Sequence, residues 1–350
     1  MLMTKFYFIN NMIFKNHLMN YLFTMMMIFS TIIVINSYSW INAWMGLEIN
    51  MLSFIPLMIF KSKNKISNAM MIYFIIQASS SSMLLMLIMM TKMNLNFNMM
   101  NFIMNMIQIT LLMKLGATPF HWWMPKILIY LNWMNCFYIL TWQKISPLMM
   151  LMNSNNNTLI YLISLMSMLF STIIMINQTS IKLMMTYSSI NHLGWMLMLM
   201  LMNSSMMIIY FIIYLLMNLS ICLMMNKLNF TYLNQMFKIN NKTPFESITI
   251  MLLFMSIAGL PPMLGFMPKI LTIMIMIKNK FLIETFLLII LSAISLSMYI
   301  NPMLSMLMLT KMNNKWKKNK MNIKNFLYSM FIINMTLITL MLTPLMNNFM

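Results

Sequence analysis

The sequence predicts an all-α protein that crosses a membrane about eleven times, and three observations support this fold class. Of 350 residues, 61% are hydrophobic and 7% are charged, whereas roughly a quarter of the residues in soluble domains are charged. Apolar runs of about 20 residues, the length that spans a bilayer, recur along the chain. Two of the longest runs contain matching interruptions by glycine and proline. We therefore expect a polytopic membrane protein.

The apolar runs predict transmembrane helices along the whole chain. The approximate spans are 18–39, 41–60, 67–91, 102–130, 131–152, 158–177, 183–202, 204–225, 246–277, 281–300 and 325–348. Two of them, 102–130 and 246–277, are too long for one straight helix across a bilayer. Both contain the repeated interruption.

The two interruptions are "GATPFHWWMPK", residues 116–126, and "GLPPMLGFMPK", residues 259–269. Glycine and proline expose backbone hydrogen-bonding groups, which lipid tolerates only where the break is buried in protein or lines a hydrated cavity. Proline kinks that arise by chance are the alternative, and two breaks in register disfavour it. The sequence therefore predicts two functional breaks near the middle of the membrane.

Each break falls in the fourth helix of a five-helix unit, a pattern typical of inverted repeats with a site at the midplane. Since five is odd, the second unit is expected to run opposite to the first. We expect a single membrane domain over residues 1–350, with a first repeat at about 18–152, a second at about 158–300 and a C-terminal helix at about 325–348.

Residue usage indicates the origin of the gene. The chain has 59 Met and 24 Phe among its 350 residues, together with many Ile, Asn and Lys. An A+T-rich genome that reads ATA as Met produces this bias, which favours an animal mitochondrial gene, most consistent with an invertebrate. A bacterial membrane protein with unusual bias is the alternative. The start of the chain has no Arg-rich presequence or cleavable signal segment. We expect a multi-pass protein of the mitochondrial inner membrane.

The lysines predict the orientation, because loops on the side of synthesis are rich in Lys. The opposite side has only Lys92, Lys278 and Lys280. The loops on the N-terminal side hold Lys5, Lys15, Lys61, Lys63, Lys65, Lys126, Lys182, Lys227, Lys238, Lys242, Lys311, Lys315, Lys317, Lys318, Lys320 and Lys324. The N-terminus is therefore expected on the matrix side and the C-terminus on the intermembrane side.

Composition excludes several kinds of site. Cys136 and Cys222 are far apart in the sequence, whereas an iron–sulfur cluster needs about four ligands. With three His, no Asp and no glycine-rich dinucleotide motif, the chain is not expected to bind a metal, flavin, haem or nucleotide of its own. The net charge of +19 lies in short loops without an RNA-binding aromatic motif, so nucleic acid is not an expected partner.

Four charged residues fall inside predicted spans: Glu48, Lys114, Lys144 and Lys269. A charge at the centre of a membrane helix costs about 2.5 to 3.5 kcal/mol, which is a poor choice for inert packing. Snorkelling to the interface and structural ion pairs are the alternatives. At an effective dielectric constant of about 20, two unit charges 8 Å apart interact by roughly 2 kcal/mol. A row of such groups is therefore able to pass protons if waters bridge the gaps.

Two histidines are further relay candidates. His121 follows the first break, and His192 lies in "SSINHLGW", residues 188–195. A histidine in a membrane interior is suited to proton relay because it titrates near neutral pH. A hydrogen-bonded packing role is the alternative for each. The remaining acids have simpler explanations, because Glu246 and Glu284 lie at predicted helix starts.

Five motifs occur along the chain in this order: "WMGLEINMLSFIP" (44–56), "MKLGATPFHWWMPK" (113–126), "LTWQKISP" (140–147), "YSSINHLGWM" (187–196) and "GLPPMLGFMPK" (259–269). Together they resemble the antiporter-like membrane subunits of respiratory complex I. The length of 350 residues fits a shorter member of this family. The resemblance implies one antiporter-like domain within a hetero-oligomeric, proton-translocating NADH:ubiquinone reductase. It implies lipids such as cardiolipin and other complex I membrane subunits as partners.

The resemblance also implies the roles of individual residues. Protons would be relayed through Glu48, Lys114, Lys144 and Lys269, driven by quinone reduction elsewhere in the complex. NADH, FMN, iron–sulfur clusters and ubiquinone would be bound by partner subunits and none by this chain. The sequence departs from the family at Lys126, where an acid is expected, and in an N-terminal extension of about a dozen residues.

Two other functions remain open at this point. A stand-alone cation/proton secondary antiporter would use the same broken helices, and activity of the isolated chain in vesicles would favour it. A structural scaffold would leave four buried charges without a purpose, and normal coupling after neutralising all four would favour it.

Overall fold

A computed structural model of the chain describes residues 2–59, 66–93, 97–154, 157–236, 244–261 and 263–310. Side chains are described over 18–59, 66–93, 99–154, 158–236, 248–261 and 263–300. The chain forms two compact units. The first covers Met1–Gly116 and Phe120–Leu159, and the second covers Ala117–Pro119 and Ile160–Met350.

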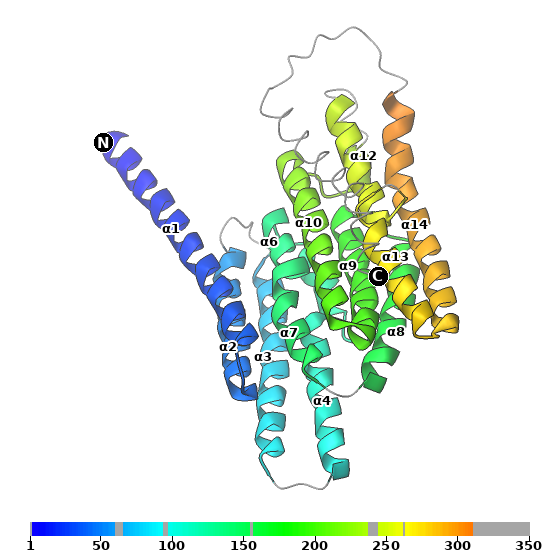
Figure 1. Ribbon diagram of the computed structural model, residues 1–350. Helices are drawn as coiled ribbons and strands as arrows, with labels where there is room; N and C mark the ends of the chain where they lie inside the picture. Colours follow the sequence, from blue (N-terminus) through cyan, green and yellow to red (C-terminus); the bar gives the residue numbers. More distant parts are fainter. Residues whose placement is uncertain are drawn as a thin grey trace. The chain divides into compact units, whose positions relative to one another are not determined.

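The first unit contains the helices up to residue 152 (Figure 1). They are α1 (Leu2–Ile35), α2 (Trp40–Ile59), α3 (Ile66–Thr91), α4 (Phe97–Leu115), α5 (Trp123–Leu128), α6 (Trp133–Phe137), the π-helix η1 (Tyr138–Trp142) and α7 (Gln143–Met152). Helix α2 packs against α1 and α3, while α4 packs against α3 and α7. These contacts bring α2, α3, α4 and α7 together as the frame of the first unit.

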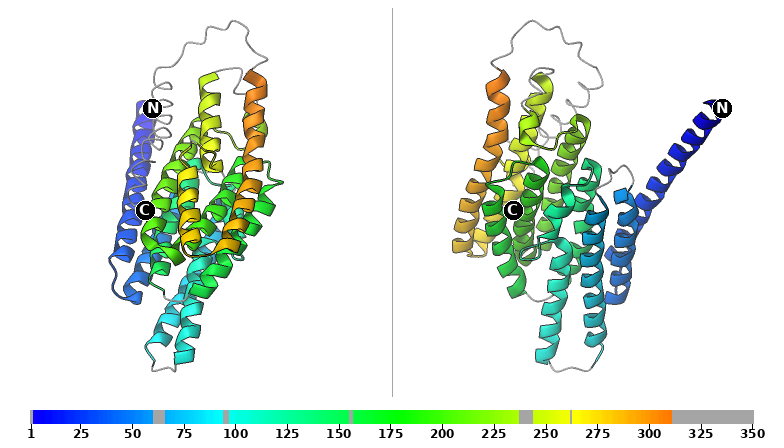
Figure 2. Two further views of the ribbon diagram at one scale, coloured as in Figure 1. Left: turned by 45° about the vertical axis from the view of Figure 1, so that its right-hand side comes forward. Right: turned by 180° about the vertical axis from the view of Figure 1, so that it is seen from behind.

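The second unit is built from the later helices. They are α8 (Asn157–Met175), α9 (Ile181–Met202), α10 (Ser204–Leu228), α11 (Leu233–Met236), α12 (Pro244–Ala258), α13 (Phe266–Lys278) and α14 (Leu282–Thr310). Helix α12 packs against α10 and α14, and α13 packs against α9, α10 and α14. The two views of Figure 2 show α12 and α14 side by side.

The described residues form an all-helical membrane protein, as the composition predicts. Five helices within them are long and apolar enough to cross a bilayer. Their spans are Leu18–Ile35, Ile66–Thr91, Thr158–Met175, Ser204–Leu228 and Leu282–Ile300. Large apolar side chains such as Phe74 and Ile283 are exposed on them, which suits contact with lipid. The predicted C-terminal helix at 325–348 lies outside the described residues.

The first predicted span, 18–39, begins at the same residue as the candidate membrane span Leu18–Ile35, and the helix α1 that contains it extends back to Leu2. One predicted element differs from the structure. The segment 131–152 is not one regular helix, because the π-helix η1 separates α6 from α7. A π-helix needs no glycine or proline, and "YILTW" (138–142) contains neither. The local sequence therefore does not predict the π-helix at this position.

The two long segments are broken where the sequence predicts. Helix α4 ends at Leu115 and is followed by Gly116 with φ 69°. Helix α12 ends at Ala258 and is followed by Gly259 with φ 77°. Glycine adopts this left-handed conformation without the steric cost that other residues meet, and it commonly follows the last residue of a helix. Both breaks thus start with the same backbone geometry.

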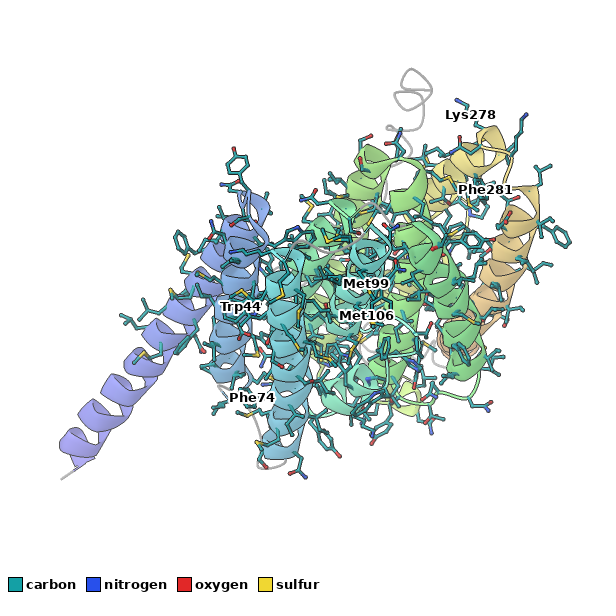
Figure 3. All side chains as sticks on the ribbon, turned by 90° about the horizontal axis from the view of Figure 1, so that it is seen from below. Trp44, Phe74, Met99, Met106, Lys278 and Phe281 are labelled. Carbon is teal, nitrogen blue, oxygen red and sulfur yellow. The ribbon has the colours of Figure 1, made fainter. Side chains whose placement is uncertain are left out.

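Polar groups also hold neighbouring helices together. The Trp44 indole on α2 donates a hydrogen bond to the Ser81 carbonyl oxygen on α3 at 3.0 Å. Figure 3 shows Trp44 and Phe74 on these helices, and it shows Lys278 and Phe281 near the turn between α13 and α14. Within an apolar medium a hydrogen bond between helices fixes their register, because hydrophobic burial does not distinguish one apolar face from another.

Candidate functional site

All three predicted intramembrane lysines lie beside an interruption of regular α-helix. Lys114 is in the last turn of α4, Lys144 is the second residue of α7 after the π-helix, and Lys269 is in the first turn of α13. They are 5%, 1% and 7% exposed, respectively. Interruptions of this kind leave backbone polar groups available to other partners. Each buried lysine therefore lies where backbone N–H or C=O groups are available for hydrogen bonds, within helices that are otherwise apolar.

Glu48 is the acidic member of the first unit. It lies on α2, is partly buried, and interacts electrostatically with Lys114 on α4. Opposite charges attract more strongly away from bulk water, because the effective dielectric constant is lower. The structure thus places the Glu48 carboxylate near enough to Lys114 for their charges to interact.

The end of α4 is held by side chains of other elements. The Trp123 indole donates to the Met113 carbonyl oxygen at 3.2 Å, and the Gln77 amide donates to the Lys114 carbonyl oxygen at 3.4 Å. These two bonds satisfy carbonyl groups that a helix end leaves without partners. They also fix the backbone of Lys114, so that its side chain starts from a defined position.

Lys144 follows the π-helix directly. The Thr141 hydroxyl donates to the Phe137 carbonyl oxygen at 2.6 Å, which satisfies a backbone group within this irregular stretch. Pro147 lies one turn further along α7. Because π-helical turns are frequent at functional sites, the π-helix η1 marks Lys144 as a candidate functional position.

Gln143, next to Lys144, joins α7 to α2 and α3. Its amide nitrogen donates to the Asn50 side-chain oxygen at 3.2 Å, and its oxygen accepts from the Tyr73 hydroxyl at 3.4 Å. Asn50 in turn donates to the Ser146 hydroxyl at 3.3 Å. We call Asn50, Tyr73, Gln143 and Ser146 the α2–α3–α7 polar cluster. The sequence prediction missed it, although Gln143 stands in the motif "LTWQKISP".

Lys269 is bonded to the helix before its break. Its Nζ donates to the Ala258 carbonyl oxygen at 2.8 Å. Ala258 is the last residue of α12, so the lysine lies at the negative end of that helix. The charge of Lys269 is thus placed where the helix dipole favours a cation.

His192 is buried on α9 among tyrosines of the second unit. Its Nδ1 is 2.8 Å from the Tyr210 hydroxyl on α10, and its ring is 5.2 Å from the ring of Tyr214. Tyr299 on α14 is also buried in this unit. The sequence singled out His192 but none of its tyrosines, because those come from other helices.

His121 and Lys126 lie at the first break. His121 is half-buried in the turn between α4 and α5. Lys126 is exposed, with Nζ 4.9 Å from the centre of the Trp122 ring, a cation–π contact. Lys126 is therefore unlike the three buried lysines.

The predicted residues are divided between the two units. Glu48, Lys114 and Lys144 belong to the first, where α4 packs against α7, and Lys269 belongs to the second. His192 is in the second unit, where α9 packs against α13. No group of three or more His, Cys, Asp or Glu side chains able to hold a metal ion occurs within the described residues.

A family model described as "NADH:quinone oxidoreductase/Mrp antiporter, TM" matches residues 37–297. The chain is 40% identical over 310 residues to NADH-ubiquinone oxidoreductase chain 2 of Anopheles gambiae, covering 87% of this chain and 91% of that protein. It is 40% identical over 336 residues to the protein of the same name in Aedes aegypti, covering 92% and 98%.

Solved structures of low sequence identity share the fold. A chain of respiratory complex I from Thermus thermophilus with bound aureothin has a TM-score of 0.81 at 17% identity, covering 93% of this chain and 79% of that one. A chain of the membrane-bound sulfane sulfur reductase, an archaeal respiratory membrane complex, has a TM-score of 0.76 at 16% identity, covering 93% and 73%.

Proposed function

The chain belongs to the NADH-ubiquinone oxidoreductase chain 2 family, the antiporter-like membrane subunits of respiratory complex I, and on that basis we propose that it translocates protons. Protons pass through Glu48, Lys114, Lys144 and Lys269. Glu48 and Lys114 modulate each other, Lys144 relays, and Lys269 exchanges protons with one aqueous side. His192 and His121 are further candidates for the relay.

The observation that carries this proposal is the burial of three lysines at interruptions of apolar helices, one of which, Lys114, interacts electrostatically with the Glu48 carboxylate. Burying an ammonium group costs several kcal/mol unless something compensates for it. Packing alone would be served better by Leu or Met at these positions. Proton transfer explains why lysines occupy these buried positions, whereas packing alone does not.

The driving force comes from outside the chain. Moving one charge against the membrane potential costs about 2.3 kcal/mol per 100 mV. As a subunit of NADH:ubiquinone oxidoreductase, the chain receives this energy from quinone reduction in partner subunits. Those subunits hold NADH, FMN, the iron–sulfur clusters and ubiquinone.

The proposal includes the arrangement in the membrane. The chain lies in the mitochondrial inner membrane as about eleven spans, in two inverted repeats at about 18–152 and 158–300 with a C-terminal helix at about 325–348. The N-terminus faces the matrix and the C-terminus faces the intermembrane space. Other membrane subunits and lipids such as cardiolipin surround it. The matching breaks at Gly116 and Gly259 support the repeat.

Substitution of Lys114→Met tests the function in the assembled complex. The readout is the proton/NADH ratio, meaning protons translocated per NADH oxidised. Because Met keeps the length of the side chain and removes its charge, we expect the ratio to fall while the complex still assembles. The matched control is Lys126→Met, which removes the exposed lysine near Trp122 and is expected to keep the ratio. An unchanged ratio in Lys114→Met removes this lysine from the path.

The stand-alone antiporter is tested separately. Cation/proton exchange by the isolated chain in vesicles, without NADH or quinone, would support that alternative. We expect no such exchange, because membership in the chain 2 family places the chain in the complex.

A further inference from the structure

The two breaks share their glycine geometry but end the preceding helix differently. At the first break, the Trp123 indole donates to the Met113 carbonyl oxygen at 3.2 Å. At the second break, the Lys269 ammonium donates to the Ala258 carbonyl oxygen at 2.8 Å. An uncharged group thus caps α4, whereas a group that carries a proton caps α12.

Gly259 leaves the space that the end of Lys269 occupies. A methyl group at Gly259 would lie 2.9 Å from Nζ and 3.2 Å from both Cδ and Cε of Lys269. Real Cβ atoms essentially never show a contact as short as the one to Nζ, and the two contacts at 3.2 Å are tighter than nine in ten real ones. Since Ala258 directly precedes Gly259 in the chain, the lysine that bonds the Ala258 carbonyl also lies against residue 259. Any side chain there would push Nζ away from its acceptor.

Gly116 provides the contrast within the same chain. Its φ of 69° is close to the 77° of Gly259, so both positions strain other residues in the same way. A methyl group at Gly116 would meet Cγ, Sδ and Cε of Met124 at 3.0, 3.0 and 3.3 Å. Met124 is flexible and has no proton to give. Both breaks therefore need a glycine for its positive φ, but only Gly259 contacts an ionisable side chain.

We propose that Gly259 is a positioning residue, because the lack of a side chain at this position lets the Lys269 ammonium cap the end of α12. The protonation of Lys269 thereby determines how firmly the end of α12 is held at the second break. A charge-assisted hydrogen bond at the negative end of a helix is stronger than one from a neutral amine. The protonated lysine therefore holds the end of α12 more firmly than the neutral form. This inference rests on the proposed role of Lys269 in proton transfer.

The test compares Gly259→Ala with Gly116→Ala in the assembled complex. Both substitutions introduce the same backbone strain, so both are expected to lower the amount of assembled complex to a similar extent. In the pH dependence of the proton/NADH ratio, Gly259→Ala is expected to resemble Lys269→Ala, because it displaces this lysine. Adding Gly259→Ala to Lys269→Ala is expected to change the ratio no further. A wild-type pH profile in Gly259→Ala, or a further fall of the ratio in the double variant, would overturn the inference.

A double substitution separates positioning from simple structure. Lys269→Ala removes the side chain that the new methyl group would meet. If Gly259 acts through Lys269, adding Gly259→Ala to Lys269→Ala lowers the thermal midpoint of the complex only as much as Gly116→Ala does. A larger drop in the double variant would mean that Gly259 serves another contact, which overturns the inference.

The outcomes also distinguish this inference from the proposed function. An unchanged proton/NADH ratio in Lys269→Ala contradicts the role of Lys269 itself. A lowered ratio in Lys269→Ala, with a wild-type ratio and pH profile in Gly259→Ala, contradicts only the inference. If Gly259→Ala alone does not assemble, assembly of the double variant supports the inference, and its failure to assemble contradicts it.

Discussion

Nδ1 of His192 lies 2.8 Å from the hydroxyl oxygen of Tyr210, and both side chains are buried in the second unit. The bond joins α9 to α10 and fixes the orientation of the imidazole ring. Which nitrogen of a histidine is able to receive or give a proton depends on the bond made by the other. Tyr210 is therefore in a position to control how His192 takes part in any relay.

Tyr210→Phe is expected to lower stability and to alter proton translocation. Phe keeps the ring packing and removes one buried hydrogen bond, which costs about 1 to 3 kcal/mol. The thermal midpoint and the proton/NADH ratio of the complex measure the two effects. Tyr232→Phe is the control, because the Tyr232 side chain is exposed. If only the midpoint falls, His192 is a packing residue and has no part in the relay.

The α2–α3–α7 polar cluster leads to a second prediction. Gln143→Leu removes the bond that Gln143 donates to Asn50, the bond that it accepts from Tyr73, and its weak bond to the sulfur of Met27, while those groups stay buried. We expect a loss of about 1 to 3 kcal/mol in stability and a lower proton/NADH ratio, because Lys144 is the next residue. The measurements are the thermal midpoint and the ratio.

Gln178→Leu is the matched control for the cluster. The Gln178 amide donates to the Ile174 carbonyl oxygen within its own segment, at 3.1 Å, so no helix–helix bond is lost. Equal effects of Gln143→Leu and Gln178→Leu would show that the cluster does not hold Lys144 in place.

Gly46 makes a third prediction about the packing of α1 on α2. A methyl group at Gly46 would lie 2.5 Å from Cγ2 of Val34 and 3.1 Å from the Ser30 carbonyl oxygen. Overpacking of this kind costs about 1 to 3 kcal/mol, so Gly46→Ala is expected to lower the thermal midpoint of the complex. Adding Val34→Ala removes the nearest obstacle and should restore part of the loss. No recovery in the double variant would place the obstruction in the backbone at Ser30.

Much of this fold follows from local sequence signals. The predicted spans 41–60 and 67–91 differ by about one residue from α2 (Trp40–Ile59) and α3 (Ile66–Thr91). Their apolar runs are followed by the charged residues Lys61 and Lys92, which are costly to bury in lipid. Both breaks are signalled by glycine followed by proline, which regular helix does not accommodate.

The parts that escaped prediction depend on contacts between distant residues. The bond from Gln143 to Asn50 joins residues 93 positions apart, and the bond from His192 to Tyr210 joins different helices. Composition gives no information about which helices are neighbours. The π-helix at Tyr138–Trp142 is missed for a related reason, because its residues are compatible with ordinary helix.

The electrostatic interaction between Glu48 and Lys114 gives the last prediction. Glu48→Gln keeps the shape of the side chain and removes the charge that interacts with Lys114. At an effective dielectric constant of about 20, two opposite charges about 8 Å apart attract each other by about 2 kcal/mol. An interaction of that size changes the protonation equilibrium constant of either group more than tenfold. We therefore expect a lower proton/NADH ratio in a normally assembled complex. Glu284→Gln is the control: Glu284 accepts a bond from the Tyr161 hydroxyl at 2.7 Å, which the amide oxygen of Gln is still able to accept. If both variants keep the wild-type ratio, Glu48 contributes a local charge to Lys114 without any part in proton transfer.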